Sequence, residues 1–187
     1  MNALTFLIDV AFNTYLMIVI LRVWLQLAKA DFYNPLSQFI VKATNPILVP
    51  LRRIIPGVFG IDMAGVALAF IIAIGKFAVL SLVQGEALNW VVLPILGILM
   101  AIKKAGVLLF WILLIRAILS WVSQGGHPVE YVMAQLTEPL LAPVRRILPA
   151  MGGLDLSMLV VFIGLNFINI LIGDLLTPVI GPIWFSL

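Results

Sequence analysis

The chain has no cysteine, one histidine and few charged residues. Its 187 residues include no Cys, a single His at position 127, and only 10% Asp, Glu, Lys and Arg. The lack of cysteine excludes disulfides, thiol nucleophiles and cysteine metal sites, and one histidine cannot form a histidine cluster. We therefore expect no catalytic residues, no metal site and no cofactor, and predict that the protein is not an enzyme. We expect a capping or surface role for His127, which precedes Pro128.

Apolar residues are as abundant in this chain as charged residues are rare. They make up 64% of the chain, and the mean hydropathy is +1.22, whereas a soluble domain usually has about 45 to 50% apolar residues. A membrane span needs about 20 mostly apolar residues. Four windows meet this condition, and they predict an all-α polytopic membrane protein. The windows are residues 3–27, 63–83, 105–122 and 156–175.

Residues 88–102 are apolar but short for a crossing. They contain Pro94 and Gly97, and they end at Lys103 and Lys104. An unbroken helix from here to residue 122 would be longer than a tilted span requires. We therefore predict that residues 88–104 form a kinked, interfacial or re-entrant connection, with a fifth span as the alternative.

The sequence contains an internal repeat, because residues 34–62 align without a gap on residues 127–155. Upstream, Arg22 lines up with Arg116 once a single extra residue is allowed. We predict a first repeat over residues 1–87, with its loop at 28–62, and a second repeat over 105–187, with its loop at 123–155. Eleven positions of the first copy recur in the second: Pro35, Thr44, Pro46, Leu48, Pro50, Arg52, Arg53, Ile54, Pro56, Gly60 and Asp62.

Each repeat loop is predicted to contain a short amphipathic helix followed by a proline-rich elbow. The helix of the first copy would place Leu36, Phe39, Ile40 and Ala43 on one face, and Ser37, Gln38 and Lys42 on the other. Because proline lacks an N–H and interrupts helices, we expect the tract after it to form a stiff bend around the paired arginines. Its prolines are Pro46, Pro50 and Pro56, and Pro139, Pro143 and Pro149. Asp62 and Asp155 stand just before apolar windows and are predicted helix N-caps.

The paired arginines are the main candidates for function. Arg52 and Arg53 recur as Arg145 and Arg146 in the same proline frame. Guanidinium groups at a membrane surface bind lipid phosphates with two hydrogen bonds; the alternative is that these charges only orient or brace the loops. Six Lys and Arg residues in the repeat loops, against two in the central connection, favour cytoplasmic loops and outside termini. A fifth span would place the two loops on opposite sides.

A second candidate site consists of polar residues within the predicted spans. Lys76 aligns with Asn169 at the repeat offset, and Asp9 and Asn13 are four residues apart, on one face of a helix. Polar groups inside spans are costly and often functional. A membrane-buried Lys76 paired with Asp9 or Asp174 would suit ion coupling, but a packed polar contact between helices explains the same residues.

The repeated elements resemble the YggT family, also called YlmG-like. The resemblance is carried by Asn34-Pro35, Asn45-Pro46, the stretch from Pro50 to Pro56 and Ile61-Asp62, with their second copies. It covers essentially the whole chain and implies a small bacterial inner-membrane protein with relatives in cyanobacteria and plastids. Members are associated with osmotic or ion stress, division, nucleoid placement or membrane-complex assembly, and no catalytic residues are carried over. The second copy departs from the first at Gly125-Gly126-His127, so the two halves need not act alike.

The leading functional hypothesis is therefore a membrane scaffold, assembly or osmotic-stress factor that acts through lipid or protein contacts. Expected partners are the bilayer, including anionic lipids, and a membrane-protein partner or a second copy of the chain, but not nucleic acid. The alternative is an oligomeric ion transporter or channel component.

Overall fold

The structure is a computed structural model that describes residues 2–122, 128–147 and 156–187. These residues form an all-helical bundle, with one isolated bridge between Val58 and Ile61 as the only β-type pairing among them. The helices are α1 (Ala3–Leu27), α2 (Pro35–Ile54), α3 (Met63–Gln84), α4 (Val92–Val122), α5 (Pro128–Ile147), α6 (Leu156–Ile180) and α7 (Ile183–Ser186).

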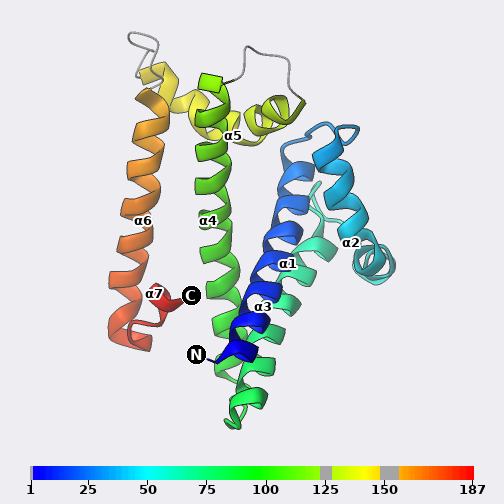
Figure 1. Ribbon diagram of the computed structural model, residues 1–187, viewed down its shortest axis with the longest axis vertical. Helices are drawn as coiled ribbons and strands as arrows, with labels where there is room; N and C mark the ends of the chain where they lie inside the picture. The colour runs from blue at the N-terminus through cyan, green and yellow to red at the C-terminus, as the bar shows by residue number, and fades with distance from the viewer. Residues whose placement is uncertain (1, 123–127, 148–155) are drawn as a thin grey trace.

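Four helices are long and apolar enough to cross a membrane. They are α1, α3, α4 and α6, and Figure 1 shows them along the long axis of the molecule. Many of their large apolar side chains are exposed, including Phe6, Ile71 and Phe167. Such exposure is unfavourable in water but favourable when lipid is the solvent. The four predicted windows are thus found as helices, and the all-α membrane fold is confirmed.

Helix α4 is the shared element of the two halves. Its Met100 packs in an apolar cluster with Leu16 of α1 and Leu68 of α3. Further along, Leu113 of α4 packs with Leu141 of α5 and with side chains of α6. Figure 1 accordingly shows α4 between α1 and α3 on one side and α6 on the other.

The start of α4 differs from the sequence-based expectation. Residues 92–102 do not form a separate kinked or re-entrant segment, because one helix of 31 residues runs from Val92 to Val122. It is about 46 Å long at about 1.5 Å per residue. Pro94 lies in the first turn, where its missing N–H would have had no helical partner. The described residues contain four candidate spans, without the alternative fifth.

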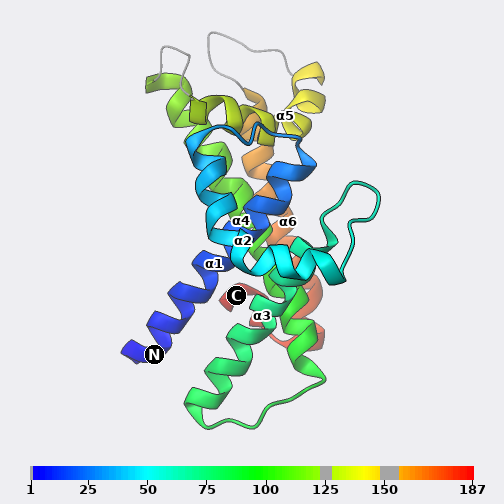
Figure 2. The same ribbon diagram turned by 90° about the vertical axis from the view of Figure 1, so that its right-hand side faces the viewer.

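The proline tracts also differ from expectation, because the helix continues through them. Pro46 and Pro50 lie inside α2, and Pro139 and Pro143 lie inside α5. Figure 2 shows that α2 turns part-way along its length, so the expected elbow is a bend within one helix. The Thr44 hydroxyl donates to the Ile40 carbonyl over 2.7 Å, a bond that bends helices.

Burial explains why this bent helix persists. One face of α2 is almost completely buried, at Ser37, Ile40, Thr44 and Leu48. Its packing outweighs the local cost of proline, which is about 3 kcal/mol in a helix interior. The buried face differs from the predicted one, since Phe39 is 60% exposed whereas Ser37 is buried. Ser37 faces inward because its N–H and hydroxyl bond the side chain of Asn34, the N-cap of α2.

Candidate functional site

The first arginine pair lies at the end of α2, where one carboxylate joins two helices. Arg52 donates through Nη2 to Asp62 Oδ2 over 2.5 Å and through Nε to Asp62 Oδ1 over 3.3 Å. Asp62 is 4% exposed and is the N-cap of α3, the role expected from the sequence, because it accepts from the Gly65 N–H over 3.2 Å. Arg52 also donates to Gln26 of α1 over 3.2 Å. This arginine therefore ties α1, α2 and α3 together.

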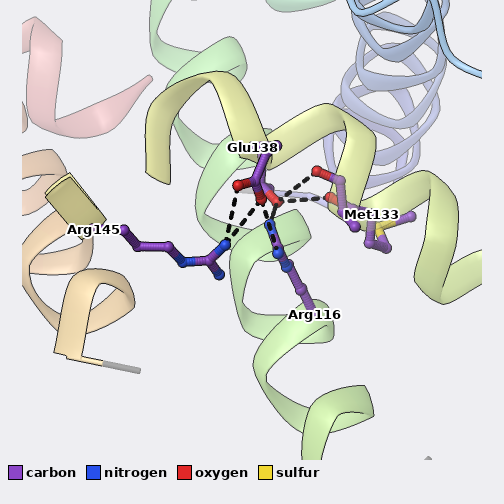
Figure 3. A network of polar contacts seen from close by, with 6 residues as sticks. Arg116, Met133, Glu138 and Arg145 are labelled. Carbon is purple, nitrogen blue, oxygen red and sulfur yellow. Dashed lines mark hydrogen bonds and ion pairs between the residues drawn. The ribbon is translucent and has the colours of Figure 1, made fainter. Parts of the chain in front are cut away.

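The second pair uses a different carboxylate. Arg145 donates from Nη1 to both carboxylate oxygens of Glu138, over 3.1 and 3.0 Å. Arg116 of α4 donates to the same carboxylate over 3.2 Å and also to the Thr137 hydroxyl. Figure 3 shows Glu138 held between the two guanidinium groups. The result is a link between α4 and α5.

The remaining arginine of each pair points outward. Arg53 and Arg146 are exposed, and no hydrogen bond or ion pair joins either to another residue that the structure describes. The predicted site therefore divides by role: Arg52 and Arg145 hold helices, and Arg53 and Arg146 are available to ligands. Pro56 follows α2 in the link to α3, whereas Pro149 and Asp155 lie outside the described residues.

Three of the four polar residues predicted within spans come together. Lys76 of α3 lies 2.6 Å from the carboxylate of Asp9 and 3.1 Å from the amide oxygen of Asn13, both on α1. Asn13 also donates to Asp9 over 2.7 Å. The Lys76 side chain is 6% exposed and that of Asp9 is 36% exposed. The ammonium group is thus paired and bonded, as burial of a charge requires.

Asn169, the repeat counterpart of Lys76, belongs to a separate polar group. Its backbone and side-chain oxygens accept from Trp184 Nε1 over 2.8 and 3.1 Å. Trp184 lies in α7, which folds back beside α6 in Figure 1. The expected correspondence of Lys76 and Asn169 is therefore one of sequence position, while their contacts differ.

Several site residues were missed from the sequence, among them Lys103, Lys104 and Arg22. Lys103 and Lys104 lie inside α4, where Lys103 donates to the Trp184 carbonyl over 3.1 Å and Lys104 to the Leu187 carbonyl over 2.6 Å. Arg22 is 7% exposed, and its buried Nε has no hydrogen-bond partner among the described residues. The signal for Arg22 was available in the repeat, where its counterpart Arg116 has a nearby Glu138 and Arg22 has Asn45 at the aligned position.

The arrangement of two related helical units agrees with a comparison to known protein families. The model of the CCB3/YggT family matches residues 1–83 and 89–176. The chain belongs to the CCB3/YggT family. This result confirms the resemblance carried by the repeated proline and arginine residues, and the two matched segments fit a two-repeat architecture.

Curated relatives in this family match along nearly their whole length. A protein of Vibrio alginolyticus described as "Uncharacterized protein in proC 3'region" is 60% identical over 189 residues, covering 100% of both chains. "Uncharacterized protein YggT" of Escherichia coli K12 is 47% identical over 177 residues, covering 94% of this chain and 92% of the relative. A protein of Haemophilus influenzae is 43% identical over 172 residues, covering 92% and 90%. None of these descriptions names a reaction, and no solved structure matches the chain.

Proposed function

We propose that the protein is a non-enzymatic scaffold of the bacterial inner membrane that gathers anionic lipids around Arg53 and Arg146. The observation that carries this proposal is the division of labour within each arginine pair. One arginine is bonded to a carboxylate, and its neighbour is exposed without a partner among the described residues. The bonded arginine fixes the helix end, so the exposed one is held at a defined place. A guanidinium group in this position can bind a phosphate with two hydrogen bonds.

The charge distribution supports a cytoplasmic position for the arginine-bearing ends. Lys103 and Lys104 lie inside α4, and not in the central connection expected from the sequence. The connection between α3 and α4, residues 85–91, therefore has no Lys or Arg, whereas α2 and α5 carry both arginine pairs. Positively charged loops stay preferentially in the cytoplasm. This side of the membrane also carries the anionic lipid surface that attracts basic residues.

Such a scaffold is compatible with roles in membrane-complex assembly or in osmotic stress. The two arginines recur at equivalent positions of α2 and α5, so one chain offers two lipid-binding points. The anionic lipids gathered around the chain would then respond to neighbouring membrane proteins or recruit them. Assembly with a protein partner or a second copy is part of the proposal and would use the exposed apolar faces of the spans, such as that of α6.

The test compares two double variants reconstituted in bilayers of phosphatidylglycerol and phosphatidylcholine. Arg53→Gln with Arg146→Gln should lower the phosphatidylglycerol enrichment of the co-purified lipid, because each basic residue near the surface contributes about 1 kcal/mol, or about fivefold. Arg53→Lys with Arg146→Lys keeps the charge and should retain most of the enrichment. Lipids are quantified by mass spectrometry and orientation by protease accessibility. If the glutamine variant changes only the orientation, the arginines are topogenic and the proposal fails.

A transport function is the second candidate, and the Asp9, Asn13 and Lys76 cluster favours it. An open hollow of about 590 Å³ lies against Asp9, lined also by Asn2, Thr5, Leu80 and Gln84. Ionisable residues that face a polar hollow within a membrane mark ion pathways in other proteins. The scaffold proposal expects liposomes with the purified protein to pass no ions above protein-free liposomes. Ion flux that Lys76→Ala abolishes and Lys29→Ala preserves would establish transport instead.

A further inference from the structure

Two arginines at related positions of the repeat have different surroundings. Arg116 lies between the Thr137 hydroxyl and the Glu138 carboxylate. Arg22 is its counterpart in the first repeat, and the residue aligned with Glu138 is Asn45. The second repeat therefore supplies its own anion to this arginine, and the first repeat has an amide instead.

Arg22 has no hydrogen-bond partner in the described part of the chain. Its Nε is buried and unbonded, and the guanidinium group lies 4.8 Å from the centre of the Phe32 ring. Asp62 is within electrostatic reach, but its oxygens already bond Arg52 and the N-terminus of α3. A buried guanidinium without a hydrogen-bonded anion is costly. The guanidinium group of Arg22 therefore lacks the hydrogen-bonded anion that its burial calls for.

A groove of about 400 Å³ opens beside this guanidinium. Lys42 contributes a second cation, and it too forms no ion pair with a described residue. The Gln26 amide oxygen accepts a hydrogen bond from Arg52, and its N–H₂ group can donate to a ligand in the groove. No carboxylate is among the residues that line the groove, which are Arg22, Gln26, Phe32, Gln38, Val41 and Lys42.

We propose that this groove is a binding site for a phosphate group, presented either by an anionic phospholipid or by free inorganic phosphate. Arg22 would bind two phosphate oxygens and Lys42 a third, and a phosphate takes the place that Glu138 occupies in the second repeat. Phe32 and Val41 form apolar walls suited to the glycerol and upper acyl region of a lipid. Arg22 lies five residues before the end of α1, about 7.5 Å along the helix, a depth within reach of lipid headgroups. The site deepens the proposed lipid-binding function, but its residues are distinct from Arg53 and Arg146.

The experiment titrates the full chain in dodecylmaltoside with dihexanoyl-phosphatidylglycerol, with inorganic phosphate, and with phosphate-free dihexanoylglycerol, by isothermal titration calorimetry. We expect a phosphate-bearing probe to bind and dihexanoylglycerol not to. Arg22→Gln should weaken binding at least about tenfold, as expected for loss of a charge-assisted contact. Lys42→Gln should weaken it less, and the matched control Lys29→Gln should leave it unchanged. Binding of the lipid alone, or of both phosphate-bearing probes, identifies the source of the phosphate.

A second variant keeps the test decisive if Arg22→Gln does not fold. Asn45→Glu gives the first repeat the carboxylate that Glu138 gives the second, so it should abolish probe binding while the protein keeps its helical circular dichroism and thermal stability. The site is refuted if no phosphate-bearing probe binds the wild type, or if binding survives both Arg22→Gln and Asn45→Glu. If phosphatidylglycerol enrichment falls only in the Arg53 and Arg146 variant, the groove does not hold the lipid, and the scaffold proposal stands. If the enrichment falls only with Arg22→Gln, the groove holds the lipid and the scaffold proposal for Arg53 and Arg146 fails.

Discussion

Asp62 performs two separable tasks, and its substitution should reveal both. It caps α3 through the Gly65 N–H and binds the Arg52 guanidinium with both oxygens. Asparagine is as good an N-cap as aspartate, so Asp62→Asn removes the ion pair and retains the cap. Asp62→Ala removes both.

The size of each loss follows from the geometry. Replacing a polar N-cap by alanine costs about 1 kcal/mol. A charge-assisted hydrogen bond contributes about 1.5 to 3 kcal/mol, but the Arg52 side chain is 36% exposed, and solvent screening lowers this contribution to about 1 kcal/mol. We therefore expect Asp62→Asn to lower the free energy of unfolding by about 1 kcal/mol and Asp62→Ala to lower it by about 2 kcal/mol.

The assay is reversible unfolding in mixed micelles of dodecylmaltoside and dodecyl sulfate, followed by tryptophan fluorescence. Arg52→Gln completes a double-mutant cycle with Asp62→Asn, and the double variant should lose about 1 kcal/mol less than the sum of the single losses. Equal losses for the two Asp62 variants would contradict the capping role, and an additive cycle would contradict the ion pair.

Two further predictions concern helix packing, and both are measured by the same micelle unfolding. Gly65→Ala should lower the free energy of unfolding by about 1 to 3 kcal/mol, because a Cβ at this position would lie 2.6 Å from the Val23 side chain. The control Gly106→Ala should raise it by up to about 1 kcal/mol, because a Cβ at position 106 would have no packing neighbour within 4 Å. Trp184→Phe removes the hydrogen bonds to Asn169, so it should lower the free energy of unfolding by about 1 kcal/mol and speed proteolysis after residue 180. The control Trp90→Phe, at a side chain that is 74% exposed, should change neither. Unchanged proteolysis in both variants would contradict the packing of α7.

The spans could be predicted from the sequence because lipid imposes a simple condition on length and hydropathy. Asp62 could be identified as a cap because capping is local in sequence. The continuation of α2 through Pro46 was missed because burial of Ile40 and Leu48 outweighs a local preference, and that burial depends on other helices. For α4, the expected interruption is absent because Pro94 lies within the first turn of the helix. The residue at which a helix begins is among the features that a sequence predicts least well.

Pairings between helices were the hardest part of the site to predict. The polar residues within spans could be named from the sequence, but the carboxylate that pairs with Lys76 depends on the packing of α1 on α3, which places Asp9 2.6 Å from this lysine. The two arginines of each pair are equivalent in the sequence, and only the positions of Asp62 and Glu138 distinguish them. Arg22 shows that a difference between two copies of a repeat carries as much information as an identity.

The bonds from Lys103 and Lys104 to residues 184 and 187 constrain how the protein is made. The acceptors follow the lysines by 81 and 83 residues. At about 5 to 20 residues per second, the ribosome needs about 4 to 16 seconds to produce them. During that interval the two ammonium groups of α4 lack these acceptors, so these bonds between α4 and the segment after α6 form only after residues 184 and 187 have been made.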